Sequence, residues 1–219
     1  MIDLHTHSVL SDGELIPSEL ARRAHVKGYR IIGITDHADP SNLEHIISSM
    51  LRLRDRMEYY TNITILPGVE ITHAPKGIIG ELIRSARKLG ALYVVVHGET
   101  IAEPVEEGTN HEAITAGADI LAHPGLITEE DVILAKEKNV LLEISARAGH
   151  SLCNGHVARL AMQTGASLVY NTDSHGPGDL TSEEEARKIV LGAGLPVEYF
   201  AVMQQNALDL VKSAAETVR

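Results

Sequence analysis

Short apolar runs alternate with helix-forming segments seven times along the chain, and this alternation restricts the fold more than any other feature. After a first strand within residues 1–7, the sequence predicts strands at 31–35, 63–69, 92–96, 119–122, 140–144 and 167–171. The predicted helices include 17–27, 43–59, 78–89, 128–138, 182–191 and 204–217. Strands that alternate with helices indicate a parallel sheet with helical crossovers. The chain is therefore an α/β protein whose sheet is either open or closed into a barrel.

Polar residues at the ends of these strands decide between the two arrangements. Most of the predicted strands end at His, Asp or Glu; His97 and His123 are two examples. In an open sheet, seven strands spaced by ~4.8 Å would place the first and last about 29 Å apart, too far for His5 and Asp173 to share a site. In a barrel, all these ends face one mouth, where active sites of such barrels lie. We therefore predict a closed or nearly closed, TIM-barrel-like fold of about seven strands, in one domain spanning residues 1–219.

The composition excludes several classes of protein. With 44% hydrophobic residues, the chain can bury the core of one domain. It has neither the roughly 18-residue apolar run of a membrane span nor the pattern of a signal peptide. A single cysteine, Cys153, fits a reducing compartment, so we expect a cytoplasmic protein without membrane contacts. The net charge of −11 and the scarcity of aromatic residues make nucleic acid an unlikely partner.

Twelve histidines among 219 residues are the compositional anomaly of this chain. His5 and His7 lie two residues apart on a strand, so both project from one face and can share a metal ion. The predicted metal ligands at the mouth are His5, His7, Asp12, His37, Glu70, His97, His123, Asp173 and His175. Imidazoles and carboxylates without thiolates suit two to three divalent ions of Zn, Mn or Fe, without selecting among them. Such a cluster activates water and binds oxyanions, which favours hydrolysis of a phosphate ester.

Other polar residues near the mouth have more than one interpretation. Asp36 and Glu143 are expected to support ligands rather than to bind metal, although a direct contact of Glu143 stays open. Arg147 either binds a substrate phosphate or forms a surface ion pair. His73 and His150 lie in loops on the mouth side, where contact with a substrate or a metal is open. The side chains expected at the surface or in packing are His25, His45, His111 and His156, and Cys153 is expected to be inert.

Six short motifs occur in order along the chain. They are His5-Thr6-His7 with Ser11-Asp12-Gly13, Thr35-Asp36-His37, Gly68-Val69-Glu70, Val96-His97-Gly98, Ala122-His123-Pro124 and Asn171-Thr172-Asp173-Ser174-His175. This ordered set resembles the polymerase and histidinol phosphatase (PHP) family, and the resemblance runs from Ile2 to about His175.

The resemblance implies a distorted seven-stranded β/α barrel with a trinuclear metal centre. By this resemblance, His5, His7, Glu70 and Asp173 hold a first metal. Glu70 bridges to a second metal that is held with His97 and His123. The third metal is held by Asp12, His37 and His175.

The activity expected from the metal cluster is that of a phosphomonoesterase acting on a small phosphorylated metabolite, similar to the histidinol phosphate phosphatases. The candidate catalytic residues are Glu70, Asp173 and Arg147, the last through a bidentate contact with a phosphate. A phosphodiesterase or nuclease of the same family is the main alternative. A non-catalytic scaffold is expected to lack ligands, and none is missing here. A C–N hydrolase of the amidohydrolase type would need a Lys at a strand end, which is absent. The substrate, the native metal and the oligomeric state stay open.

Overall fold

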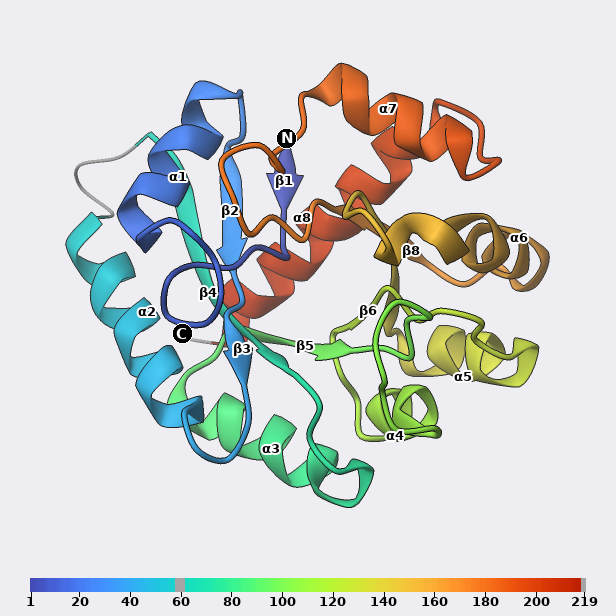
Figure 1. Ribbon diagram of the computed structural model, residues 1–219, viewed down its shortest axis with the longest axis horizontal. Coiled ribbons are helices and arrows are strands. Elements are labelled where there is room, and N and C mark those ends of the chain that lie inside the picture. The colour runs from blue at the N-terminus through green and yellow to red at the C-terminus, as the bar shows by residue number, and fades with distance from the viewer. Residues whose placement is uncertain (58–61, 218–219) are drawn as a thin grey trace.

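The predicted strands form one parallel sheet that curls into a nearly closed barrel in the computed structural model, which describes residues 1–57 and 62–217 (Figure 1). The strands follow one another in the order β1 (Ile2–Asp3), β2 (Ile31–Ile34), β4 (Thr64–Ile71), β5 (Tyr93–His97), β6 (Ile120–Ala122), β7 (Leu141–Ser145) and β8 (Leu168–Asn171). Every neighbouring pair in this order is parallel. The predicted distorted (β/α)7 barrel, a TIM-barrel-like fold in one domain, is confirmed.

A short strand that the sequence did not predict, β3 (His37–Ala38), pairs with β4 beyond the end of β2. Its register places His37 opposite Glu70. Strand β4 also continues to Ile71, two residues beyond its predicted end, so Glu70 lies inside the strand. A strand of two residues such as β3 is too short to show the alternation of apolar and polar residues by which strands are recognised in a sequence. The extra pairing matters because it fixes two candidate ligands side by side.

Helices surround the barrel (Figure 1). They are α1 (Pro17–Val26), α2 (Leu43–Met57), α3 (Lys76–Leu89), α4 (Thr109–Thr115), α5 (Glu129–Lys138), α6 (Asn154–Thr164), α7 (Glu183–Gly192) and α8 (Tyr199–Thr217), with the 3-10 turn η1 (His150–Cys153) before α6. The predicted cap of α5 is confirmed, because the Thr128 side chain accepts a hydrogen bond from the Asp131 backbone N–H. The predicted end of the second helix, at Tyr59, lies outside the described residues. Helix α8 begins at Tyr199, five residues before its predicted start.

Side chains alternate between the interior of the barrel and the layer beneath the helices. On β5, Tyr93 and Val95 face inward, whereas Val94 packs against the outer helices. The Tyr93 hydroxyl donates to the Leu4 carbonyl at 2.8 Å, so its ring crosses the interior. A Cβ on Gly33 would lie 1.9 Å from the Tyr93 hydroxyl oxygen, and one on Gly68 would lie 2.5 Å from the ring. Glycine on two neighbouring strands, β2 and β4, therefore makes room for this tyrosine.

The barrel closes between β1 and β8 through the loops that follow these strands. The Asp173 amide donates to the His5 carbonyl at 2.9 Å, and the His7 amide donates to the Ser174 carbonyl at 2.8 Å. An isolated parallel bridge joins Thr6 to Ser174 at the same place. We call this junction between β1 and β8 the seam of the barrel. The bonds hold His5 and His7 beside Asp173 and His175, which are all candidate ligands.

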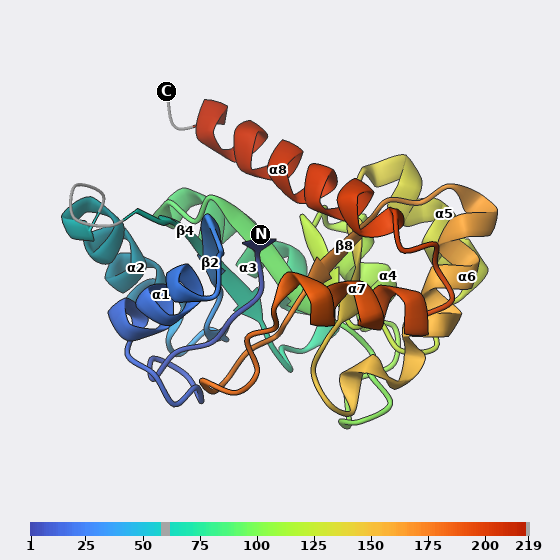
Figure 2. The same cartoon turned by 90° about the horizontal axis from the view of Figure 1, so that it is seen from above.

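Helix α8 crosses the opposite end of the barrel, where the strands begin (Figure 2). The Gln204 side-chain amide accepts from the Ile2 N–H at 2.7 Å and donates to the Ile2 carbonyl at 2.9 Å. The Asn206 side chain donates to the Leu168 carbonyl on β8 at 2.8 Å. Ala207 packs into the interior core, so α8 covers this end and leaves the mouth open. Among the described residues, no helix is long and apolar enough to cross a membrane.

Candidate metal centre

All nine predicted ligand side chains converge at the mouth of the barrel. They come from the loop after β1 (His5, His7 and Asp12), from β3 (His37), β4 (Glu70) and β5 (His97), and from the loops after β6 (His123) and β8 (Asp173 and His175). Most are buried, and Asp12 is the most exposed of them. The strand order explains the gathering, because parallel strands of a barrel end on one side.

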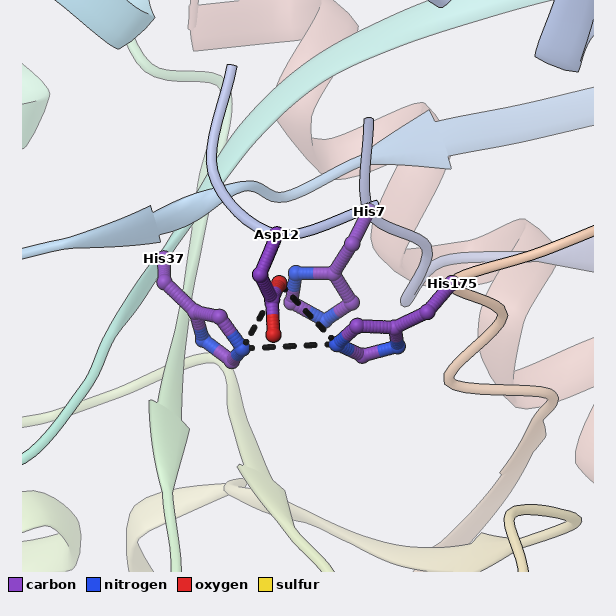
Figure 3. A group of neighbouring side chains, drawn as sticks. All are labelled: His7, Asp12, His37 and His175. Carbon is purple, nitrogen blue, oxygen red and sulfur yellow. Dashed lines mark hydrogen bonds and ion pairs between the residues drawn. The ribbon is translucent and has the colours of Figure 1, made fainter. Parts of the chain in front are cut away.

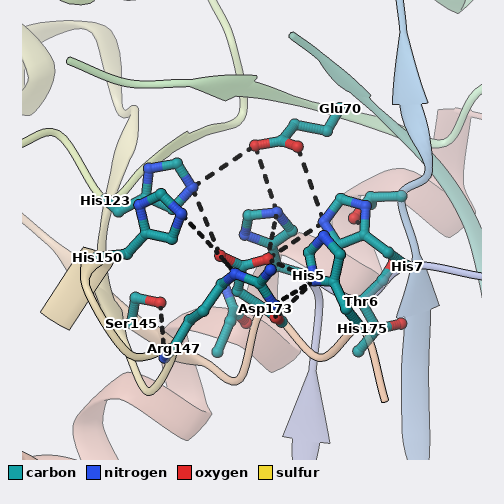
Figure 4. A network of polar contacts seen from close by, with 12 residues as sticks. His5, Thr6, His7, Glu70, His123, Ser145, Arg147, His150, Asp173 and His175 are labelled. Atoms are coloured by element: carbon teal, nitrogen blue, oxygen red, sulfur yellow. Dashed lines mark hydrogen bonds and ion pairs between the residues drawn. The ribbon is translucent and has the colours of Figure 1, made fainter. Parts of the chain in front are cut away.

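Glu70 contacts imidazoles on both sides of the cluster (Figure 4). Its Oε1 atom lies 3.3 Å from His5 Nε2 and 3.8 Å from His123 Nε2. Its Oε2 atom lies 3.7 Å from His7 Nε2 and 2.6 Å from His37 Nδ1. One carboxylate thus contacts four imidazoles that come from separate parts of the mouth. This placement is the one expected of a carboxylate that bridges two metal ions.

Asp12, His37 and His175 form a triangle at the outer side of the mouth, with His7 beneath it (Figure 3). Asp12 Oδ1 lies 3.4 Å from His37 Nε2 and 3.2 Å from His175 Nε2. The two imidazole Nε2 atoms lie 3.5 Å apart. Ligands that sit about 2.0–2.1 Å from a tetrahedral ion are separated by roughly 3.3 Å. The triangle therefore has the dimensions of a metal site rather than of a hydrogen-bonded group.

Asp173 closes the cluster on the side of the seam. Its Oδ1 atom lies 3.3 Å from His7 Nε2 and 3.7 Å from His5 Nε2, and its Oδ2 atom lies 3.6 Å from His123 Nε2. Both Asp173 and His123 have left-handed backbone conformations, with φ of 51° and 27°. This conformation is strained for residues other than glycine, and such strain is typical of functional sites.

Several buried polar atoms of the cluster have no hydrogen-bond partner. They are His5 Nε2, His7 Nδ1 and Nε2, Glu70 Oε1, His123 Nδ1 and Glu143 Oε1. Buried polar atoms in proteins almost always have a partner, so this concentration requires an explanation. Metal ions fit the donor set and its spacing, and they would satisfy the Nε2 and carboxylate oxygen atoms that face the centre.

Protonation in the metal-free chain follows from burial and from the crowding of charges. Burial holds the pKa of His7 and of His123 well below the usual value, so both imidazoles are neutral and offer lone pairs. Burial raises the pKa of Asp173 to about 7. Burial opposes the charging of His5, but Glu143 and Glu70 outweigh it and raise the pKa of His5 well above its usual value. Protons on His5 and Asp173 thus reduce the repulsion between the carboxylates, as bound cations would.

Glu143 contacts one of the candidate ligands, and Asp36 contacts the loop that carries others. The His5 Nδ1 atom lies 2.7 Å from Glu143 Oε2, and a proton shared there leaves His5 Nε2 directed at the cluster. Asn171 also donates to Glu143 Oε2, at 2.9 Å. The Asp36 carboxylate accepts from the backbone N–H and hydroxyl of Ser8, both at 2.7 Å, and so fixes the loop after β1.

Arg147 lies in the mouth with about a third of its side chain exposed (Figure 4). Its Nη1 atom donates to His175 Nδ1 at 2.7 Å, and its Nε atom lies 3.9 Å from Asp173 Oδ2. The Asp173 carbonyl also lies 3.0 Å from His175 Nδ1. These two contacts need different tautomers of His175, because Nδ1 accepts in one and donates in the other. A metal on Nε2 would favour the donating tautomer, and Arg147 would then keep its contacts with the Asp173 carbonyl and carboxylate.

Two further side chains join the site, and the sequence analysis missed one of them. The His150 ring stacks on His123 with centroids 4.0 Å apart, and it lies beside Glu103. Glu103 contacts His97 and His73 as well. Sequence gave no signal for Glu103, because the same loop also carries Glu99, Glu106 and Glu107. The histidines expected elsewhere lie on helices, and they are His25, His45, His111 and His156.

A cavity of about 370 Å³ opens beside the cluster. Its lining residues are Asp12, His37, Ala38, Asp39, Ser41, Asn42, Thr72, His73 and Glu103. Polar side chains dominate this lining, and none is a large apolar one. A small polar molecule that contacts the metal cluster would fit here.

The family model of the PHP domain matches residues 3–164. An uncharacterised protein of Methanocaldococcus jannaschii is 49% identical over 88% of this chain and 89% of its own length. A protein of Shewanella sp. strain MR-4, named a probable phosphatase, is 30% identical over 89% of this chain and 84% of its own length. The structure of a proposed histidinol phosphatase of Listeria monocytogenes has a TM-score of 0.61 and 15% identity, with 82% of this chain and 97% of that chain covered. At that identity, the last likeness shows the fold alone.

Proposed function

The chain belongs to the PHP domain family, and on that premise we propose that it is a metal-dependent phosphomonoesterase that acts on a small polar metabolite. One observation carries the proposal: nine imidazole and carboxylate side chains converge at the barrel mouth with the spacing of metal ligands. The name of the Shewanella relative supports the reaction class.

The proposed ligand groups follow the contacts of the cluster. His5, His7, Glu70 and Asp173 would hold one ion, and the triangle of Asp12, His37 and His175 would hold another. When bound, two to three ions of Zn, Mn or Fe supply an activated water and neutralise the charge of a phosphate group.

Arg147 would orient the phosphate group of the substrate. Its guanidinium lies beside Asp173 and His175, and the side chain is partly exposed to the mouth. A planar guanidinium can contact two phosphate oxygens at once, which fixes the orientation as well as the charge.

The cavity beside the cluster supports a small substrate. At about 370 Å³ it lies near the lower limit of ligand pockets in proteins. Asn42 and Thr72 offer hydrogen bonds to a leaving group, and Asp39 adds a carboxylate at the rim. A polar alcohol fits this lining better than an extended polymer does.

A nuclease or phosphodiesterase is the alternative that the same cluster could serve. The net charge of −11 opposes the approach of a polyanion over a long range, whereas a small phosphate ester meets only the local field of the mouth. This favours the monoester.

Parallel assays test the proposal. The enzyme loaded with Mn, Zn or Fe is given p-nitrophenyl phosphate, its bis ester, a panel of phosphorylated polar metabolites and single-stranded DNA. We expect the highest kcat/KM for a monoester of the panel. Faster cleavage of DNA or of the bis ester would assign a phosphodiesterase instead, and loaded protein without activity on any ester would assign a scaffold.

A further inference from the structure

His97 is directed at a carboxylate outside the predicted ligand set. Its Nδ1 atom donates to the Gly98 carbonyl at 3.1 Å, so Nε2 is the one ring atom left to bind a metal. That Nε2 atom lies 3.2 Å from Glu103 Oε2. Among the described residues, no contact of 4.0 Å or less joins His97 to Glu70. The nearest carboxylate partner of His97 is therefore Glu103.

Glu103 contacts three imidazoles, each through its Nε2 atom. Its Oε2 atom lies 3.1 Å from His73 Nε2 as well as 3.2 Å from His97 Nε2, and its Oε1 atom lies 3.4 Å from His150 Nε2. These separations are close to the roughly 3.3 Å between ligands of a tetrahedral ion. The donors come from two loops, from the 3-10 turn η1 and from the end of β5.

The backbone around this group is arranged to hold it. His73 has a left-handed conformation with φ of 50°, which a β-substituted residue adopts at a cost. His150 is buried and held by the Thr100 hydroxyl at 2.8 Å from Nδ1, so its Nε2 faces Glu103. Strained and tethered imidazoles that surround one carboxylate indicate a built site.

We propose that Glu103 is a metal ligand, and that it binds the ion at His97 together with His73 or His150. Nitrogen ligands with one carboxylate suit the same Zn, Mn or Fe class as the rest of the cluster. Glu103 and His73 are 39% and 43% exposed, whereas Glu70 is fully buried. The ion at His97 would therefore depend on an exposed loop, as would the ion beside Asp12, whose side chain is 57% exposed.

Substitution of Glu103 tests the proposal through metal content, a readout that needs no turnover. Glu103→Gln removes the charge but keeps the shape, and Glu107→Gln is the matched control in the same loop, an exposed residue that belongs to none of the candidate ligand groups. Both variants and the parent are loaded, dialysed against a weak chelator and analysed for metal per chain. Circular dichroism confirms that each variant is folded.

We expect Glu103→Gln to lose one ion per chain, or to bind its weakest ion roughly tenfold less tightly or worse, since even indirect ligand contacts are worth that much. Glu107→Gln should match the parent. Unchanged stoichiometry and affinity in Glu103→Gln would overturn the proposal, and loss of every ion would overturn the assignment to one site.

His73→Asn provides an independent second variant. Asparagine tolerates the left-handed conformation of this position, so the imidazole is removed without new strain. With Co²⁺ in the site, the visible absorption of the parent should change in Glu103→Gln and stay unchanged in Glu107→Gln. A change in His73→Asn as well would identify His73, rather than His150, as the partner ligand. An unaltered spectrum in both test variants would contradict the proposal, whatever the enzyme hydrolyses.

Discussion

Single side chains of the cluster differ in how many others depend on them. Glu70 contacts four imidazoles, whereas Glu143 contacts only His5 among the imidazoles. Removing a group with several partners leaves each of them without that polar contact in a largely buried place. We therefore expect the loss of metal on substitution to depend on how many contacts a side chain makes in the cluster, rather than on its residue type.

Glu70→Ala should lose more metal than any single histidine variant, because its carboxylate lies between two ligand groups. Elemental analysis of Glu70→Ala, His123→Ala and the parent, all loaded in the same way, measures this. Glu143→Ala serves as a control for loss of a buried carboxylate that supports one ligand. A histidine variant that retains less metal than Glu70→Ala would contradict the bridging role.

Arg147→Lys should lower kcat/KM on the best phosphomonoester by roughly 1–3 kcal/mol of transition-state stabilisation, because lysine cannot make the bidentate contact. Arg159→Lys, on the exposed face of α6, is the control and should leave the kinetics unchanged. Equal kinetics for Arg147→Lys and the parent would contradict a role of Arg147 in binding the substrate phosphate.

The convergence of the nine candidate ligands at one mouth could be predicted from the sequence, because each follows or ends a recognisable strand. Their residue types and the parallel order of the strands were sufficient to place them at one mouth. Glu103 could not be predicted, because its contact with His97 depends on the path of the loop between β5 and α4. Nothing in local sequence distinguishes it from Glu99 or Glu106.

Among the elements, α8 is unusual because its polar side chains complete the sheet. Gln204 satisfies both backbone groups of Ile2, and Asn206 satisfies a carbonyl of β8. The alternation of elements was predictable, but this role of α8 was not, since it depends on side-chain amides that replace strand pairing. The early start of α8 was missed although Phe200 and Met203, three residues apart, already follow a helical period; both pack into the outer core.

Gln204→Ala should destabilise the protein by about 1–3 kcal/mol, because it leaves the N–H and carbonyl of Ile2 without partners in a partly buried place. Urea unfolding followed by circular dichroism measures the difference. Gln205→Ala, which removes an exposed contact within the same helix, should change stability by less than about 0.5 kcal/mol. Similar losses in the two variants would show that the seam does not depend on Gln204.

At the scale of the whole molecule, the cluster places like charges inside an already acidic protein. Glu70, Glu143 and Asp173 are all buried at the mouth of a chain with a net charge of −11. In the metal-free form this repulsion is relieved in part by protons on His5, His37 and Asp173, whose pKa values are raised, and by the Arg147 guanidinium beside Asp173. The folded state should therefore depend on cations for part of its stability.

Chelation should lower the thermal midpoint of the parent. An ion present at 100 times its dissociation constant stabilises the native state by about 2.7 kcal/mol, which corresponds to roughly 5–10 °C for a chain of this size. Differential scanning fluorimetry with and without chelator measures the shift, and Glu70→Ala should show a smaller one. An unchanged midpoint in the parent would contradict the metal centre.

The seam of the barrel also sets the time at which the site can be completed during synthesis. Leu4 and Asn171, which are bonded across it, are 167 residues apart. At roughly 5–20 residues per second, a ribosome needs about 8–33 s to make the second after the first. His5 and His7 therefore leave the ribosome long before Asp173 and His175 exist. A fragment trimmed to residues 3–164 would lack both late ligands, so full metal loading can serve as a check that a nascent chain has reached β8 and joined its two ends.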